Sequence, residues 1–160
     1  MRILTESEIR RISEPVQNAP ENLVELYKVF LQMCVLCSES KGIGLAAMQV
    51  GLPWRFFVAQ RPDGAFEGFV NCEYEPVGEA KEPSIEGCLS IKREDGEFRF
   101  YEVQRHSSVR IKGELLTDDL KKVPLDKTLD GLYSTVCQQE IDHQRKVLIS
   151  DIGKEIHVYQ

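Results

Sequence analysis

Long apolar segments are missing from this chain. No run approaches the about 18 consecutive apolar residues that a transmembrane helix needs, so the sequence offers no membrane-spanning candidate. The N-terminus, Met-Arg-Ile-Leu-Thr-Glu-Ser-Glu, contains neither an apolar core nor a small-residue cleavage site, so no secretory signal is visible. We therefore expect a cytoplasmic protein in a reducing environment.

An excess of basic residues is also missing. The chain has 20 Lys and Arg residues against 26 Asp and Glu residues, which gives a formal net charge of −6. Nucleic acids and anionic membrane surfaces attract cationic proteins, so this balance argues against a general partner of either kind. We expect no nucleic-acid partner and no membrane partner.

Cysteines are few and do not form a disulfide framework. There are five of them, an odd number scattered along the chain: Cys34, Cys37, Cys72, Cys88 and Cys137. Cys34 and Cys37 form a Cys-x-x-Cys motif, which is typical of a redox pair or of half a zinc site. However, both continue an apolar helical spacing that begins at Leu23, and no second pair completes a zinc site. We favour buried, structural thiols over the redox and metal alternatives.

The length suits one domain. A chain of 160 residues can bury a sizeable core but is too short for two comfortable domains, and it contains no repeat, low-complexity segment or linker. We predict a single domain over residues 1–160. Helices are predicted over 20–39 and 128–145, and strands over 54–60, 66–72, 98–104, 108–116, 147–149 and 156–159. Without regular strand-helix alternation, this order indicates an α+β fold.

The helix predicted over 128–145 carries polar side chains on an apolar face. Three- and four-residue spacing places on one side Leu129, Leu132, Val136, Gln139, Glu140 and His143. Buried polar groups must form hydrogen bonds or coordinate an ion. In the pattern His-Glu-x-x-His, two imidazoles on one helix face bind a metal ion and the Glu acts as a general base. Glu140 and His143 match this pattern, but Gln139 stands at the first imidazole position.

Two other short motifs carry candidate chemistry. They are Gly-Ile-Gly-Leu-Ala-Ala-Met-Gln at 42–49 and Glu-Gly-Cys-Leu-Ser at 86–90. The glycines lack the Gly-Lys-Ser/Thr ending of a phosphate-binding loop, so we assign them to close backbone approach to an extended peptide. A thiolate beside an imidazole is a reasonable metal site, which makes Cys88 a candidate ligand. His106 and His157 lie outside any motif and are predicted as surface or hydrogen-bonded residues, with a substitute ligand role as the alternative.

Together, the stretches 42–49, 86–90 and 138–144 resemble the three motifs of the peptide deformylases. These are metal hydrolases that remove the formyl group from N-terminal formyl-methionine. The resemblance implies an α+β fold in which antiparallel β-sheets pack around a central metal-motif helix, with another helix near the N-terminus. It also implies a divalent metal cofactor, usually Fe²⁺ and replaceable by Zn²⁺, Ni²⁺ or Co²⁺.

The resemblance further implies a role for each motif residue. The family's metal-ligand positions are occupied by Cys88, Gln139 and His143, and its general-base position by Glu140. The oxyanion donors correspond to Gln49 and the backbone N–H of Leu89, and the substrate-binding positions to Ile43, Gly44 and Val136. Gly44 would hydrogen-bond the substrate backbone, while Ile43 and Val136 would help to line the methionine pocket.

Gln139 departs from the family pattern and weakens the predicted metal site. Its amide oxygen is a neutral, hard donor that suits Ca²⁺ or Mg²⁺ better than Zn²⁺ or Fe²⁺. We therefore expect hydrolysis of formyl-methionyl peptides and nascent chains at reduced efficiency. The alternative is an impaired relative that binds peptide N-termini, or another partner, without turnover. A purely structural domain is the least favoured reading, because it leaves Glu140 and His143 without a task.

Two further departures concern the end of the chain. Gln144 occupies a position where the family usually has an apolar residue. Many bacterial relatives carry a C-terminal helix implicated in ribosome docking, and none is evident in the sequence before Gln160. We expect any ribosome contact to be transient and weakened accordingly.

Overall fold

The structure is a computed structural model that describes residues 1–157. Within this range the elements are, in chain order, α1 Glu6–Arg10, β1 Gln17–Asn18, α2 Leu23–Glu39, β2 Gly44–Ala46, the 3₁₀ helix η1 Ala47–Val50, β3 Trp54–Gln60, β4 Phe66–Pro76, β5 Lys81–Glu86, β6 Phe100–His106, β7 Ser108–Leu116, β8 Lys122–Asp130, α3 Gly131–Gln144, α4 Ile149–Ile152 and β9 Lys154–Ile156.

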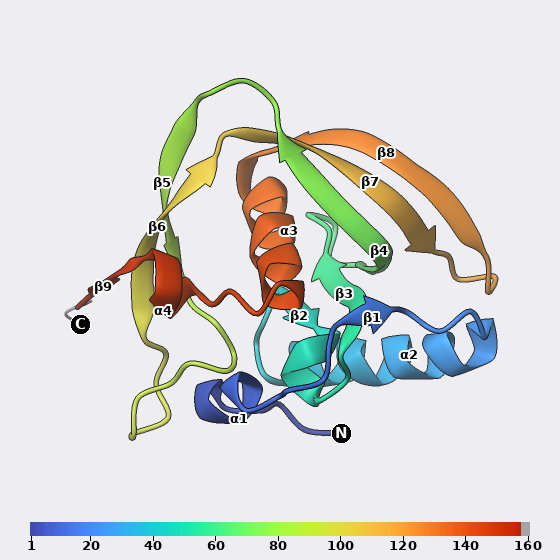
Figure 1. Cartoon of the computed structure of the whole chain (residues 1–160), viewed down its shortest axis with the longest axis horizontal. Helices are drawn as coiled ribbons and strands as arrows, with labels where there is room; N and C mark the ends of the chain where they lie inside the picture. The colour runs from blue at the N-terminus through green and yellow to red at the C-terminus, as the bar shows by residue number, and fades with distance from the viewer. Residues whose placement is uncertain (158–160) are drawn as a thin grey trace.

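The strands form two sheets with helix α3 between them (Figure 1). The larger sheet has the order β1-β3-β4-β7-β8, and β2 also pairs with β3. The smaller sheet has the order β5-β6-β9. Every pairing is antiparallel except that of β1 with β3. The expected α+β arrangement of antiparallel sheets around the motif helix is confirmed.

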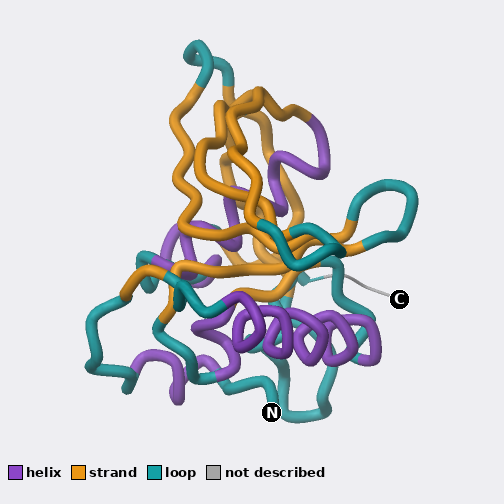
Figure 2. The backbone as a smooth tube through the Cα atoms, turned by 90° about the vertical axis from the view of Figure 1, so that its right-hand side faces the viewer, coloured by secondary structure: helices purple, strands orange, loops and turns teal. Residues whose placement is uncertain are grey.

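Helix α2 covers the larger sheet and begins three residues later than predicted. The Asn22 side chain accepts a hydrogen bond from the Glu25 N–H at 3.0 Å, which makes Asn22 the N-cap and leaves Pro20 outside the first turn. The buried face of α2 packs in one core cluster with β2 and β3 residues such as Leu45 and Phe56. Figure 2 shows this long helix running beside the strands. Cys37 lies in this cluster, as its helical spacing predicted.

The start of helix α3 differs from the prediction because residues 122–130 form strand β8. This strand was not predicted, since Pro124 and its charged residues are uncommon in a central strand. Among residues 1–157, β8 pairs only with β7, so Pro124 lies in an edge strand, where the missing N–H is tolerated. Gly131, at φ +65°, then turns the chain into α3. Leu129 therefore belongs to β8, and Leu132 is 71% exposed, so neither extends the buried helix face.

The strand predicted over 147–149 is wrong. Leu148 and Ile149 lead into the short helix α4, where both side chains are buried in a cluster with Cys88, Ile91 and Val103. The following strand, β9, is Lys154–Ile156, so only the start of the strand predicted over 156–159 lies among the described residues. No helix within residues 1–157 is long and apolar enough to cross a membrane.

Gln144, the last residue of α3, carries a buried amide without partners. The residue is 5% exposed, and neither Nε2 nor Oε1 finds a hydrogen-bond partner among the described residues. Gln138, one turn and a half earlier, is buried to a similar degree but fully bonded: Oε1 accepts from His106 N, while Nε2 donates to His106 O and Ser134 Oγ. An unsatisfied buried polar group costs about 1–3 kcal/mol of stability.

We therefore expect Gln144→Met, which removes the unpaired amide at similar volume, to raise the free energy of unfolding by about 1–2 kcal/mol. The matched variant Gln138→Met should lower it by about 1–3 kcal/mol, because it leaves the His106 backbone groups unpaired. Urea denaturation of the three proteins measures both changes. Destabilisation by Gln144→Met equal to that of Gln138→Met would contradict this account of the Gln144 amide.

Candidate active site

Helix α3 presents the predicted polar residues to a cavity between the two sheets. Cys137 and Ile141 pack into the core of the larger sheet, whereas Val136, Glu140 and His143 line the cavity from the other side of the helix. All of these side chains are buried. The sequence spacing thus predicted the functional face of the helix correctly from position 136 onward.

Gly44 allows strand β2 to lie directly against this helix. A Cβ at that position would be 2.8 Å from Glu140 Oε2 and 2.9 Å from Val136 Cγ1, so any larger residue must displace one of them. The glycine therefore serves close approach of β2 to α3. Its predicted use, close approach to an extended peptide, stays a prediction. The result is that the backbone of residues 43–44 forms one wall of the cavity.

Cys88 reaches the cavity from a tight turn that follows strand β5. The Ile91 N–H donates to the Cys88 carbonyl at 2.9 Å, which closes the turn and directs the thiol toward α3. Cys88 Sγ lies 3.7 Å from His143 Nε2, and both residues are buried. Two residues 55 positions apart in the chain are thereby brought to one point, as the motifs predicted.

Glu140 fixes the orientation of the His143 ring. Glu140 Oε1 lies 2.8 Å from His143 Nδ1, so the carboxylate holds this nitrogen and leaves Nε2 directed at Cys88. Burial lowers the pKa of His143, but the nearby Glu140 carboxylate and Cys88 sulfur outweigh it and raise the pKa to about 10. A metal ion that binds the neutral imidazole must therefore displace a proton.

Gln49 borders the same cavity with its amide nitrogen. Its Oε1 accepts a hydrogen bond from the Ala46 N–H at 2.9 Å, which settles which end of the amide is which. Its Nε2 donates to Ser90 Oγ at 3.1 Å and approaches Cys88 Sγ at 3.5 Å. Gln49 is thus a donor fixed beside the Cys88–His143 pair, where the motif comparison predicted one. Ser90, which helps to hold it, was not singled out from the sequence.

Gln139 turns its amide nitrogen away from a ligand role. Its Nε2 donates to the Gly87 carbonyl at 3.0 Å, so only Oε1 remains as a donor atom for a metal ion. Within residues 1–157, no group of three or more His, Cys, Asp or Glu side chains is arranged to hold a metal ion. The donor set at this site is therefore one thiol, one imidazole and one amide oxygen.

The cavity has a volume of about 290 Å³ and brings together every residue that the sequence proposed for the site. These are Ile43, Gly44, Gln49, Cys88, Leu89, Val136, Gln139, Glu140 and His143. Its rim adds apolar side chains that the sequence did not assign, among them Ile85 and Leu132, which are 65% and 71% exposed. Exposed apolar side chains around a polar centre indicate a ligand with an apolar part.

The residues set aside from the sequence remain outside this cavity. Neither His106 nor His157 lines it. Cys34 and Cys37 are free thiols, and burial raises the pKa of each to about 12, so neither is a reactive thiolate at neutral pH. This agrees with the structural reading of the Cys-x-x-Cys motif.

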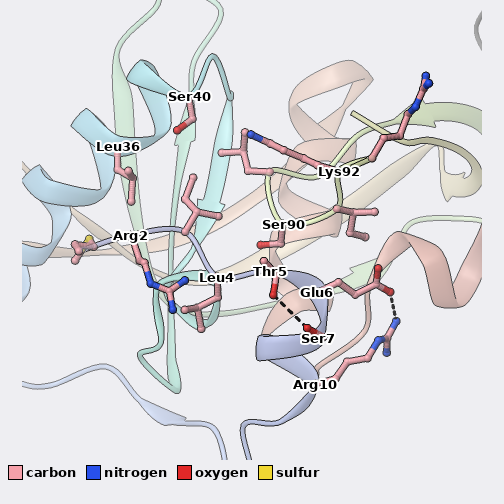
Figure 3. A pocket seen from close by; sticks show the side chains of 15 residues that line it. Arg2, Leu4, Thr5, Glu6, Ser7, Arg10, Leu36, Ser40, Ser90 and Lys92 are labelled. Atoms are coloured by element: carbon pink, nitrogen blue, oxygen red, sulfur yellow. Dashed lines mark hydrogen bonds and ion pairs between the residues drawn. The ribbon is translucent and has the colours of Figure 1, made fainter. Parts of the chain in front are cut away.

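A second cavity, of about 730 Å³, lies against the N-terminal segment and the 89–93 loop (Figure 3). Here the N-terminal segment supports the active-site elements through backbone hydrogen bonds. The Leu4 N–H donates to the Gln49 carbonyl at 2.7 Å, and the Glu6 N–H donates to the Ser90 carbonyl at 2.9 Å. Only Leu89 is shared between the two cavities, so the thiol and imidazole belong to the first.

Comparison with known proteins identifies the family. Residues 2–157 match the model of the family described as polypeptide deformylase. The chain is 36% identical over 157 residues to a peptide deformylase of Rhodopseudomonas palustris (93% of this chain, 82% of that protein) and 35% identical over 153 residues to one of Mesorhizobium japonicum (93% and 80%).

Solved structures agree with this match. A probable peptide deformylase from Synechococcus phage S-SSM7 has a TM-score of 0.80 and 29% identity, covering 95% of this chain and 99% of the phage protein. The peptide deformylase of Thermotoga maritima has a TM-score of 0.77 and 30% identity, covering 94% and 95%. The expected fold is confirmed, and the chain belongs to the polypeptide deformylase family.

Proposed function

We propose that this cavity hydrolyses the formyl group from the N-terminal formyl-methionine of peptides and nascent chains. The observation that carries the proposal is the convergence of Cys88 Sγ and His143 Nε2 at 3.7 Å, with Glu140 bonded to the imidazole. Family membership over residues 2–157 supports the same reaction. In it, a water oxygen attacks the formyl carbon, the carbon–nitrogen bond breaks, formate leaves and the freed amine takes up a proton.

The donor set fits a divalent metal ion in part. In a tetrahedral zinc site, a bond of about 2.3 Å to sulfur and a bond of about 2.0–2.1 Å to nitrogen would place the sulfur and nitrogen atoms about 3.6 Å apart. Cys88 and His143 meet this requirement, and Gln139 can add its amide oxygen. We propose Fe²⁺ as the ion and these three residues as its ligands. When bound, the ion supplies a Lewis acid that makes water a better nucleophile at neutral pH.

Glu140 is proposed as the general base. One carboxylate oxygen is held by His143 Nδ1, and Gly44 lets the other lie close to β2, so the group is fixed at the cavity wall. A fixed, buried carboxylate can accept the proton of the attacking water and return it to the leaving amine. Its position one residue after Gln139 and three before His143 agrees with this role.

Gln49 and Leu89 are proposed as the oxyanion donors. The Gln49 amide nitrogen is held beside Cys88, and Leu89 follows Cys88 in the same turn and lines the cavity. Hydrogen-bond donors fixed in advance stabilise the charge that develops on the formyl oxygen.

The substrate is proposed to lie along β2. The Gly44 backbone lines the cavity, with the side chains of Ile43 and Val136 beside it, and Ile43 is partly open to solvent. An extended peptide can use this backbone for hydrogen bonds while its methionine side chain contacts the apolar residues. We further propose that the chain acts as one domain in the cytoplasm, in transient contact with ribosomes that present formyl-methionyl chains.

A second candidate function is binding of peptide N-termini without turnover. The hydrogen bond from Gln139 to the Gly87 carbonyl favours it, because this bond ties helix α3 to the Cys88 turn without a metal ion. The groove would then persist while the reaction centre is weakened.

The variant Gln139→His distinguishes the two candidate functions. It restores an imidazole four residues before His143, so we expect metal affinity to rise by more than the about 100-fold associated with outer-shell changes. Turnover of a formyl-Met peptide should rise chiefly in kcat, because a third strong ligand fixes the reacting water. Metal content after anaerobic purification and steady-state kinetics of both proteins measure this.

Glu140→Ala in the Gln139→His protein is the control, and it should abolish turnover while metal remains bound. A parent protein that already holds one tight metal and matches the variant in turnover would show that Gln139 does not impair the site. A metal-loaded variant that stays inert would instead support the binding function.

Gln49→Leu should lower kcat by about 10²–10³-fold with KM nearly unchanged, because it removes an oxyanion donor. The matched variant Ser90→Ala removes only one partner of the Gln49 amide and should lower kcat far less. Both substitutions are introduced into the parent protein if it has measurable turnover, and otherwise into the Gln139→His protein, and kcat and KM are then measured. A kcat for Gln49→Leu within threefold of its parent would exclude the oxyanion role.

A further inference from the structure

A buried arginine links the two segments that carry the active-site donors. Arg105, on strand β6, is 3% exposed. Its Nε and Nη2 donate to the two carboxylate oxygens of Glu86 at 2.9 and 2.8 Å, and its Nη1 donates to Asp142 Oδ2 at 2.6 Å. Glu86 lies two residues before Cys88, and Asp142 lies immediately before His143.

We propose that Arg105 is a positioning residue that sets the separation of Cys88 Sγ from His143 Nε2. A guanidinium group is planar, and its donors have a fixed spacing, so the three hydrogen bonds hold Glu86 and Asp142 at a defined distance and angle. Glu86 lies two residues before Cys88, and Asp142 lies next to His143. The distance between the two acids therefore determines the distance between the Cys88 thiol and the His143 imidazole. The proposal rests on the function proposed above for the cavity.

Burial restricts the Arg105, Glu86 and Asp142 side chains to this one hydrogen-bonded arrangement. Burial lowers the pKa of Arg105, but the Glu86 and Asp142 carboxylates raise it more, so the guanidinium stays charged. A buried charge that loses its partners is left uncompensated, which is strongly destabilising, so alternative arrangements of this group are disfavoured. The second Asp142 oxygen accepts from the Tyr74 hydroxyl at 3.0 Å, which connects the group to strand β4 of the larger sheet.

Attachment of α3 to strand β6 does not itself require Arg105. The Gln138 amide already bonds both backbone groups of His106, at 3.1 and 3.0 Å, and so joins the helix to β6. Strand β5 is likewise already joined to β6 by backbone pairing, as far as Glu86 opposite Tyr101. What Arg105 adds is a side-chain link between Glu86, which precedes the Cys88 turn, and Asp142 on the helix. A function in setting the spacing between the turn and the helix, rather than in attaching either of them to β6, therefore follows from the bonding pattern.

The need for such positioning is greater in this chain because Gln139 replaces a strong ligand. With one fewer imidazole to pull the ligand set together, the remaining thiol and imidazole must be held in place by the protein. Outer-shell residues that orient metal ligands typically contribute 10–100-fold to metal affinity or activity, and we expect Arg105 to lie at the upper end of this range.

The test uses Arg105→Lys, which keeps the charge but loses the planar array of donors, and Glu86→Gln, which keeps the shape but loses the negative charge and replaces one acceptor oxygen with an NH2 donor. We expect each to lower Co²⁺ affinity by about 10–100-fold, followed through the thiolate-to-metal absorption band. In the metal-free proteins, hydrogen–deuterium exchange over residues 86–91 should become faster by a similar factor, while the middle of α3 stays protected. If the parent chain does not retain Co²⁺, the titrations are made in the Gln139→His protein.

Two variants serve as controls for a merely structural effect. Leu26→Ala removes a fully buried side chain from the first turn of α2, in the core cluster that extends to Leu89, and should lower the melting temperature without changing Co²⁺ affinity or exchange over 86–91. Arg99→Lys disrupts another bidentate Arg–Glu pair, to Glu155, beside strand β9, and should likewise leave the site unchanged.

Exchange over 86–91 that is no faster in Arg105→Lys than in Leu26→Ala would overturn the proposal. So would a loosened turn with unchanged Co²⁺ affinity, because the donors would then not depend on Arg105. A turn that loosens, in a protein that neither binds Co²⁺ nor removes formyl groups even with Gln139→His, would instead refute the proposed function and leave the positioning role standing.

Discussion

The site depends on bringing one thiol and one imidazole, 55 positions apart, to within 3.7 Å without a covalent link. Cys88 comes from a turn after β5 in the smaller sheet, and His143 comes from the helix between the sheets. A shift of 1 Å in either element would spoil a shared ligand geometry. The surrounding hydrogen bonds hold the Cys88 turn and helix α3 at a fixed distance from each other, and they do so through several independent contacts.

These supports come from every side of the cavity. Gln49, in η1, contacts the Cys88 turn, and the N-terminal segment holds Gln49 and Ser90 through their backbones. Arg105, on β6, joins Glu86 before the turn to Asp142 on the helix. Gln139 adds a direct hydrogen bond between helix and turn. The residue that we propose to weaken the donor set therefore also joins the helix to the turn that carries Cys88.

The sequence grouped the candidate site residues more accurately than it placed the bounds of the surrounding helices and strands. Helical spacing correctly placed Glu140 and His143 on one face, and the three motifs correctly grouped Gln49 and Cys88 with them, because these depend on local geometry. Strand β8 was missed, since an edge strand tolerates Pro124 and its pattern is set by pairing with β7. Arg105 could not be assigned either, because its role arises only when the fold brings Glu86 and Asp142 within reach of its side chain. The one sequence signal for it was Asp142, a charged residue on a buried stretch of helix.

The central claim is that Cys88 and His143 bind one divalent metal ion together. X-ray absorption spectroscopy of the anaerobically purified protein, loaded with one equivalent of Fe²⁺, tests it most directly. The account predicts one sulfur neighbour at about 2.3 Å, at least one imidazole, and otherwise oxygen or nitrogen ligands, with the sulfur absent from Cys88→Ser. A bound metal with no sulfur neighbour in the unmodified protein, or one whose sulfur survives Cys88→Ser, would contradict it.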